Sequence, residues 1–172
     1  MSPAHLLEQL DQYLREIFEA EKDKFASSGA EGVLVCLDHQ QKILKVASAK
    51  RPLWVQHQGG VIEEIRPQRR ILGQPSKLKH WDEHTLILGT GSRLYFFSDG
   101  IPDEGNTEGF SFGKYRLKAM LQNLEQTPSD MLTNEIGSAL RSWRGEANQR
   151  HDQTLIVWEI SKNWAHSIFV CN

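Results

Sequence analysis

A carboxylate at the end of an apolar strand is the feature of this sequence with the clearest chemical meaning. Asp99 closes the apolar run RLYFFS at residues 93–98, and Gly100 follows it directly. A glycine lets the backbone turn sharply, so the pair can present a carboxylate oxygen to a hard cation. An Asp-Gly pair also forms ordinary turns without any ligand, and the local spacing leaves both interpretations open.

A second carboxylate stands at the start of another predicted strand. Asp152 precedes the run QTLIVWEI at residues 153–160, and His151 lies beside it. Strand ends can meet on one rim of a sheet, so Asp99 and Asp152 are candidate ligands of one metal ion. His151 is a third candidate, because imidazole is a common metal ligand. Taken alone, Asp152 is also typical of a turn, and a lone histidine is typical of a solvated loop.

Composition and spacing argue against several other functions. Lys and Arg number 20 against 22 Asp and Glu, a net charge of −2 that argues against a nucleic-acid-binding surface. The cluster of Arg66, Arg69 and Arg70 is predicted to be a solvated loop rather than a phosphate site. The segment GTGS at residues 89–92 lacks the lysine and the spacing of a phosphate-binding loop and is predicted to be a turn.

The cysteines and the apolar runs indicate a cytoplasmic protein. Cys36 and Cys171 both lie in apolar runs, and neither has the nearby cysteine that a zinc site would need. Two cysteines do not make a disulfide framework, which fits a reducing compartment. The amphipathic N-terminus carries acidic residues, unlike a signal peptide, and no apolar run approaches the length of a membrane span.

The hydrophobic pattern predicts an α+β fold with mostly antiparallel sheet. A first helix is expected from Pro3 to about Lys24, with one buried face made by Leu6, Leu7, Leu10, Tyr13, Leu14, Ile17 and Phe18. Strands are expected at residues 32–38, 42–49, 53–58, 61–65, 85–88, 93–98, 153–160 and 167–171, and helices at 114–124 and 127–144. Helices and strands are separated along the chain, and no change in composition marks a second domain, so residues 1–172 are predicted to form one domain.

In their order along the chain, several motifs resemble those of the metal-dependent protein phosphatases. This is the PPM or type 2C superfamily, in its bacterial branch related to stage II sporulation protein E. The segment LYFFSDG resembles the family's apolar strand with Thr/Ser-Asp-Gly, and HDQT, at residues 151–154, resembles its closing Asp-Asp-x-Thr. Weaker matches are ASAKRPL at residues 47–53, ILG at 71–73 and FSFGKYRL at 110–117. The resemblance runs from about Leu6 to Ile160.

The resemblance carries expectations for fold, cofactor and partners. It implies part of the family's α/β-β/α sandwich, with flanking helices, and Mg²⁺ or Mn²⁺ bound by Asp99 and by Asp152 or His151. Family members use two such ions to activate a water that attacks phosphorus. It also implies a protein serine/threonine phosphatase that acts on a signalling protein, such as an anti-sigma-factor antagonist, and that follows a sensor domain.

Two departures from the family pattern leave the activity open. The chain contains no Gly-Asp dipeptide, where the family has the Asp that bridges the metals. We therefore expect the C-terminal part of a phosphatase domain, weak or inactive alone, that forms a homodimer or associates with its missing N-terminal half. Counting back from Thr154, His151 takes the place of the usual metal-binding Asp. Either His151 coordinates instead, or Asp152 does so, or the ligand is lost. The alternative is a catalytically silent domain that binds a partner.

Overall fold

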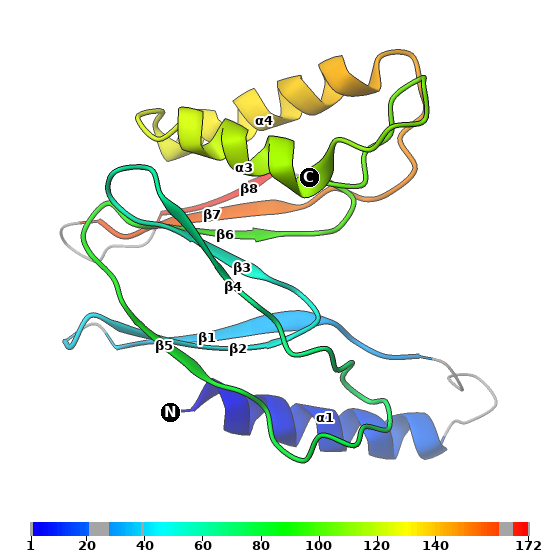
Figure 1. The fold of residues 1–172 in the computed structure, drawn as a ribbon. Coiled ribbons are helices and arrows are strands. Elements are labelled where there is room, and N and C mark those ends of the chain that lie inside the picture. Colours follow the sequence, from blue (N-terminus) through cyan, green and yellow to red (C-terminus); the bar gives the residue numbers. More distant parts are fainter. Residues whose placement is uncertain (1, 21–27, 39, 162–166, 172) are drawn as a thin grey trace. The chain divides into compact units, whose positions relative to one another are not determined.

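The computed structural model describes residues 2–20, 28–38, 40–161 and 167–171, which form an α+β fold with antiparallel sheets, as predicted. The first elements are helix α1 (Pro3–Ala20) and strands β1 (Gly32–Asp38), β2 (Ile43–Ala49), β3 (Leu53–Gln56), β4 (Ile62–Ile65) and β5 (His84–Ile87). They are followed by β6 (Arg93–Phe97), α3 (Gly113–Asn123), α4 (Ser129–Arg144), β7 (Leu155–Glu159) and β8 (Ser167–Cys171) (Figure 1).

The chain divides into two compact units, of which the first contains Met1–Leu53 and Glu64–Leu88. Its sheet has the strand order β1-β2-β5, and α1 contacts β1 and β2. A small core is formed by Leu7, Ala47, Ala49, Leu72 and Trp81. The alternation of apolar residues in β1 and β2 thus gives the sheet a face that the helix covers. The prediction of one domain over residues 1–172 stays a prediction.

The buried face of α1 differs from the predicted one. Leu7 is buried with 1% of its surface exposed, but Leu10 and Tyr13 are 40% and 61% exposed. The buried position one turn after Leu7 is instead Asp11, at 3% exposure. The apolar residues of this helix spread over an arc wider than the sheet covers, so periodicity alone assigned too many of them to the core.

A buried carboxylate holds a long loop of the first unit against α1. Asp11 accepts hydrogen bonds from Arg70 Nη2, from Arg15 Nη2 at 2.9 Å and from the backbone N–H of Gly73 at 2.8 Å. The guanidinium of Arg70 also lies 4.4 Å from the centre of the Trp81 ring. Arg70 is only 7% exposed, so the prediction of a solvated arginine cluster was wrong for this residue. A buried guanidinium needs such partners to offset its lost hydration.

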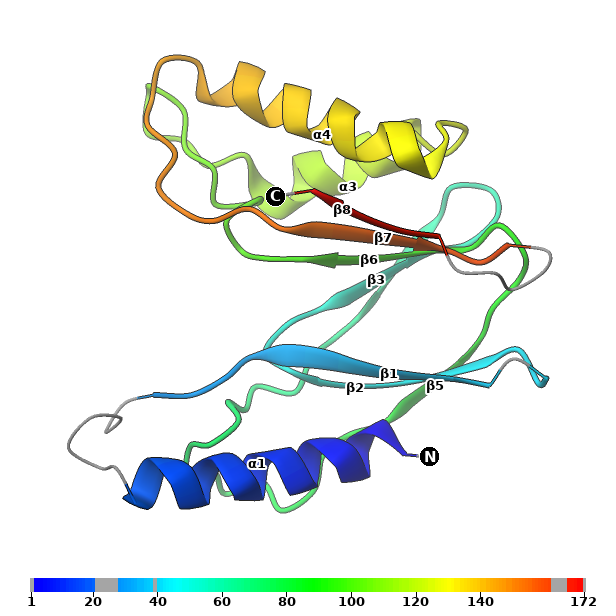
Figure 2. The same cartoon turned by 180° about the vertical axis from the view of Figure 1, so that it is seen from behind.

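The second unit contains Trp54–Glu63 and Gly89–Asn172 and holds the strands that matter most for function. Its sheet has the order β4-β3-β6-β7-β8, with the predicted central strand β6 between β3 and β7. Helices α3 and α4 lie on the same face of this sheet (Figure 2). Their buried side chains Leu117, Leu121, Leu132, Ile136 and Leu140 join Trp54, Tyr95, Phe97 and Val157 in one core.

The two turns predicted from glycine-containing segments connect their strands in different ways. Gly59 and Gly60 have φ angles of +89° and +77°, as a tight turn between β3 and β4 requires, so the predicted hairpin is confirmed. The turn at residues 89–92 connects β5 to β6, but these two strands belong to different sheets. This turn therefore passes the chain from one sheet to the other rather than closing a hairpin.

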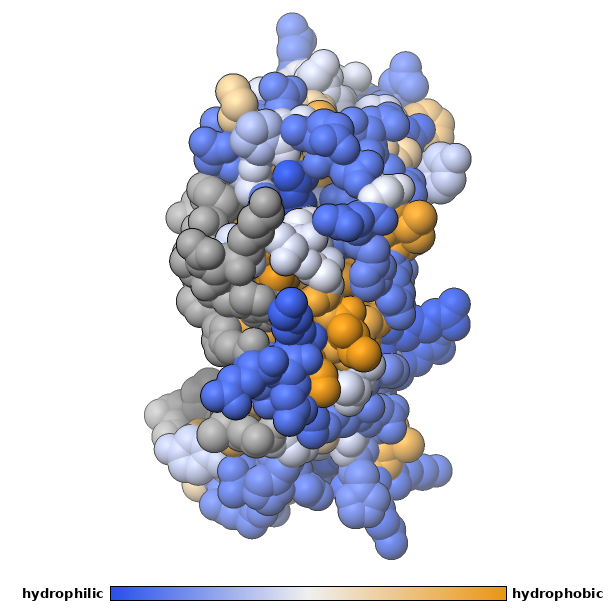
Figure 3. Space-filling view, turned by 90° about the vertical axis from the view of Figure 1, so that its left-hand side faces the viewer, coloured by the Kyte–Doolittle hydropathy of each residue, from blue (hydrophilic) through white to orange (hydrophobic). Residues whose placement is uncertain are grey.

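The surface carries some exposed apolar side chains. On the face seen in Figure 3, most residues are hydrophilic and hydrophobic ones gather in only part of it. Val61, Phe110 and Tyr115 are 63%, 62% and 86% exposed. Cys36 is a half-buried free thiol. Within the residues that the structure describes, no helix combines the length and apolar character needed to span a membrane.

Candidate functional site

The predicted metal ligands lie at one edge of the five-stranded sheet. Strands β6 and β7 run antiparallel, and Phe97 pairs with Leu155 at the end of the register. The chain leaving β6 and the chain entering β7 therefore meet at that edge. Asp99 follows the first strand, His151 and Asp152 precede the second, and all three are exposed. The structure thus brings together the two segments that the sequence singled out.

Ser98 holds these two segments side by side. Its backbone N–H donates to the carbonyl of Thr154 at 3.0 Å, which continues the pairing beyond β6. Its hydroxyl accepts a hydrogen bond from the Thr154 N–H at 3.0 Å and donates to the carbonyl of Asp152 at 3.1 Å. One side chain thereby fixes the backbone of both candidate ligand segments.

Gly100 is required for a close approach rather than for a left-handed turn. A Cβ at this position would lie 2.2 Å from the carbonyl oxygen of Asp152 and 3.1 Å from Cβ of His151. The φ of Gly100 is outside the left-handed region, in contrast to Gly91 and Gly109. The chain does turn here as expected, with the N–H of Ile101 donating to the carbonyl of Ser98 at 3.4 Å, but the requirement for glycine is steric. Any side chain here would push the Asp152 backbone away.

Sequence reasoning did not single out Glu104, which lies in the same loop as Asp99. Its carboxylate is buried, with 4% of the residue exposed, whereas the neighbouring Asp103 is exposed. The loop begins with a hydrogen bond from the N–H of Asp103 to the carbonyl of Asp99 at 2.9 Å. No periodic pattern marks Glu104, because its burial depends on contacts to residues far along the chain.

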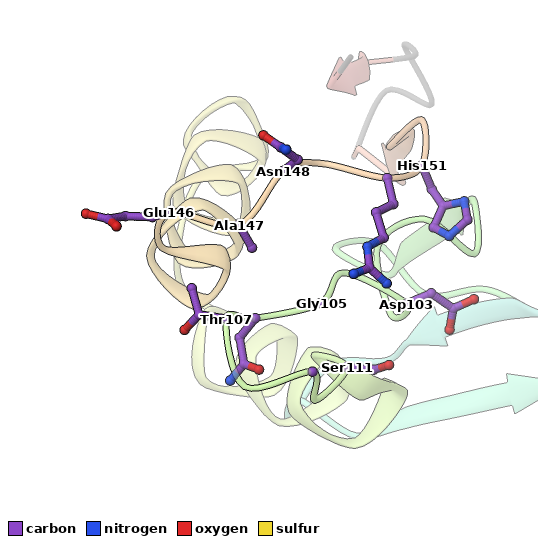
Figure 4. Close-up of a pocket in the computed structure, with 11 residues that line it drawn as sticks. Asp103, Gly105, Thr107, Ser111, Glu146, Ala147, Asn148 and His151 are labelled. Atoms are coloured by element: carbon purple, nitrogen blue, oxygen red, sulfur yellow. The ribbon is translucent and has the colours of Figure 1, made fainter.

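A polar pocket of about 500 Å³ lies between the loop at residues 103–111 and the segment at 146–151. Figure 4 shows Asp103 and His151 at one end of this pocket and Thr107 and Glu146 at the other. Arg150 also lines it. His151 therefore belongs both to the predicted ligand set and to the lining of a polar surface pocket.

The candidate ligands fit a single metal ion that keeps most of its water ligands better than they fit a pair of ions. The two carboxylates near one sheet edge provide the hard oxygen donors that Mg²⁺ and Mn²⁺ prefer, whereas the imidazole of His151 would add a nitrogen donor. In the described part of the chain, no three side chains of His, Cys, Asp or Glu gather closely enough to hold a metal. Water would therefore complete most of the coordination. Which of His151 and Asp152 takes part stays a prediction.

Comparisons with known proteins agree with the predicted resemblance. Residues 1–161 match the family described as Stage II sporulation protein E (SpoIIE). The SiaA-PP2C domain of Pseudomonas aeruginosa is 27% identical, with a TM-score of 0.79 over 92% of this chain and 61% of that chain. The present chain thus spans less than two thirds of that domain. No curated protein matches the sequence.

Two further solved structures support the fold alone. The phosphatase domain of the cell fate determinant SpoIIE from Bacillus subtilis is 17% identical, with a TM-score of 0.59 over 92% of this chain and 73% of that chain. The RsbU and RsbW domains of Rv1364c from Mycobacterium tuberculosis are 16% identical, with a TM-score of 0.70 over 91% of this chain and 41% of that chain. The chain therefore belongs to the SpoIIE family and has an α+β fold like that of its PP2C-type phosphatase domains.

Proposed function

We propose that this chain is a phosphatase module that removes phosphate from serine or threonine residues of a signalling protein, with Mg²⁺ or Mn²⁺. The observation that carries the proposal is the convergence of the ends of β6 and β7, which places Asp99 and Asp152 at one sheet edge. Membership of the SpoIIE family supports the reaction class. The 27% identity to a PP2C domain supports it as well.

The residues of the chain have separate roles in this proposal. Asp99 would hold the cation together with Asp152 or His151. A bound divalent ion lowers the pKa of a coordinated water and neutralises the charge on phosphoryl oxygens. Ser98 and Gly100 hold the two ligand segments in register. The site is exposed, so a phosphorylated side chain of another protein can reach it without an opening motion.

The substrate and partners are proposed from the family resemblance. A phosphorylated anti-sigma-factor antagonist is a suitable substrate, and a sensor domain is a suitable regulator. We also propose a cytoplasmic location for the chain. Association with a second copy or with a further segment of the phosphatase domain stays a prediction.

We expect the 172-residue chain to be a slow enzyme on its own. It has no Gly-Asp dipeptide to supply the bridging carboxylate, and its candidate ligands are Asp99, Asp152 and His151. A single ion with few charged ligands binds weakly, because Mg²⁺ gives up its hydration reluctantly. It also cannot clamp the attacking and the leaving oxygen as a metal pair does.

A catalytically silent domain that binds a partner is the second candidate. Two observations favour it: the described residues contain no group of three metal-binding side chains, and His151 stands where the family has an aspartate. In that case the exposed polar pocket beside His151 would serve recognition without hydrolysis.

Release of phosphate from a phosphoserine peptide, with and without excess Mn²⁺, separates the two candidates. We expect slow, Mn²⁺-dependent release that falls to the background rate in Asp99→Asn. The matched control is Asp130→Asn, an equally conservative change at an exposed residue in the first turn of α4, which should keep the wild-type rate. Equal background rates in all three proteins would favour the silent domain.

A further inference from the structure

A buried carboxylate stands directly behind the candidate metal site and has no role in the proposal so far. Glu104 lies in the loop that follows Asp99 and is 4% exposed. Burying a carboxylate is costly unless charged and polar partners replace its hydration. An acidic residue in a loop is normally exposed to solvent, as the neighbouring Asp103 is. The partners of Glu104 therefore indicate why it is turned inward.

The carboxylate of Glu104 joins three segments that meet at the site. Gln153 donates a hydrogen bond from Nε2 to Glu104 Oε2 and lies between Asp152 and Thr154 in the closing motif. Arg144, the last residue of α4, places Nη1 3.5 Å from the same oxygen. Gln153 Nε2 also lies 3.4 Å from the carbonyl oxygen of Gly100. One carboxylate thus connects the Asp99 loop, the end of α4 and the Asp152 segment.

The backbone of Glu104 is held as firmly as its side chain. Its carbonyl oxygen accepts hydrogen bonds from the N–H of Phe112 at 2.8 Å and from Trp143 Nε1 at 3.2 Å. Trp143 in turn contacts two neighbours. Its ring centre lies 5.9 Å from that of Phe112, and the guanidinium carbon of Arg116 lies 4.3 Å from the centre of the Trp143 ring. The backbone of Glu104 therefore cannot shift without breaking contacts to Phe112, which precedes α3, and to Trp143 of α4.

We propose that Glu104 is a positioning residue that sets the metal affinity of the site through Gln153. It does not bind the ion. It holds the amide of Gln153 inward, against the Gly100 carbonyl, and so fixes the neighbouring Asp152 beside Asp99. This inference rests on the proposed metal-dependent function. Residues that orient metal ligands from behind commonly change metal affinity by about 10-fold to 100-fold when they are removed.

A purely structural role for Glu104 predicts a different pattern among variants. If the carboxylate only neutralises Arg144, then Arg144→Gln and Glu104→Ala should lower thermal stability and leave Mn²⁺ affinity unchanged. If it positions the ligands through Gln153, then Gln153→Ala should weaken Mn²⁺ binding although it leaves the Arg144 contact in place. The two roles therefore separate in affinity and melting temperature.

The test is a titration of the 172-residue chain with Mn²⁺, in which electron paramagnetic resonance counts the free ion and circular dichroism gives the melting temperature. We expect Glu104→Ala and Gln153→Ala each to weaken Mn²⁺ binding about 10-fold, with a double variant no weaker than either single one. Arg144→Gln should stay within about 2-fold of the wild type, because this change leaves the Gln153 contact intact. If Glu104→Ala does not fold, Gln153→Ala alone decides.

The outcomes distinguish failure of the inference from failure of the proposed function. Wild-type Mn²⁺ affinity that depends on Asp99 but is unchanged in Glu104→Ala and Gln153→Ala overturns the positioning role alone. Additive losses in the double variant overturn the pathway through Gln153. Absence of Mn²⁺ binding by the wild-type chain overturns both the positioning role and the metal-dependent function.

Discussion

The backbone of Gly100 lies so close to Asp152 that an added Cβ would come within 2.2 Å of the Asp152 carbonyl oxygen. This approach joins two segments that are 52 positions apart in the chain, the end of β6 and the start of β7. Together with the Ser98 hydrogen bonds, it determines how far apart the carboxylates of Asp99 and Asp152 can lie. The candidate metal site depends on it.

Replacing Gly100 should therefore destabilise the fold and loosen the site together. We expect Gly100→Ala to lower the free energy of unfolding by about 1–3 kcal/mol, as overpacking in a closely packed region does. Gly105→Ala is the matched control, because a Cβ there would meet no atom within 4 Å and its φ is not left-handed. It should change stability by less than about 0.5 kcal/mol. Urea unfolding of both variants measures the difference; equal midpoints would show that the Asp152 backbone moves aside freely.

Removing Asp11 should be among the most costly changes in the first unit. Asp11→Ala leaves the buried guanidinium of Arg70 without its carboxylate, and breaking a buried ion pair in this way costs about 3–5 kcal/mol. Glu16→Ala is the control on the same helix, since Glu16 is exposed and accepts a hydrogen bond from the exposed side chain of Gln12. Denaturant unfolding followed by circular dichroism gives both values.

A double variant tests the cause of that loss. If the unpaired charge is responsible, Asp11→Leu combined with Arg70→Met should be more stable than Asp11→Leu alone, because no charge is then left buried. A double variant that is less stable than the single one would instead assign the loss to the Gly73 hydrogen bond and to packing.

Tyr95 should make stability fall at high pH. Burial raises the pKa of Tyr95 from 10.0 to about 12, and its hydroxyl donates a 2.6 Å hydrogen bond to Gln56. Between these pH values the unfolded chain releases the proton and the folded chain keeps it. The contribution is therefore complete below pH 10.0 and is lost as the pH rises to about 12. Tyr95→Phe should flatten this part of the stability profile, measured by urea unfolding; an unchanged slope in the variant would show that another group is responsible.

The raised pKa of Tyr95 can also be followed directly by absorbance. The phenolate absorbance of the wild type minus that of Tyr95→Phe isolates the ionisation of Tyr95, provided that both proteins stay folded. We expect this difference to appear near pH 12. A difference that is already complete at pH 10 would contradict the burial of the hydroxyl.

The edge at which the site lies could be predicted from the sequence, but the contacts that shape it could not. The apolar run before Asp99 predicts β6, and the apolar run after Asp152 predicts β7. The sequence therefore shows directly that each of these two strands has a carboxylate near one end. The burial of Glu104 and Arg70 depends on partners 49 and 59 positions away. Such long-range pairings leave no periodic signal, so both residues look like ordinary solvated loop residues in the sequence.

The exposed side of α1 illustrates the same limit. Leu10 and Tyr13 fit the apolar period of the helix as well as Leu7 does, yet of these three only Leu7 belongs to the small core of the first unit. The width of the buried face is set by the sheet that covers it and not by the helix sequence.

The most direct test of the account is a calorimetric titration of Mn²⁺ into the 172-residue chain and into Asp99→Asn, Asp152→Asn and the double variant. We predict one ion per chain, bound weakly because water supplies most of its ligands. Each single substitution should lower the affinity about 10-fold or more, and the double variant should bind more weakly than either single variant but lose less than the sum of the two losses, because the two ligands act on one ion. Asp130→Asn should bind as the wild type does. Binding that is unchanged in the double variant, or absent from the wild type, would contradict the claim that Asp99 and Asp152 share one divalent cation.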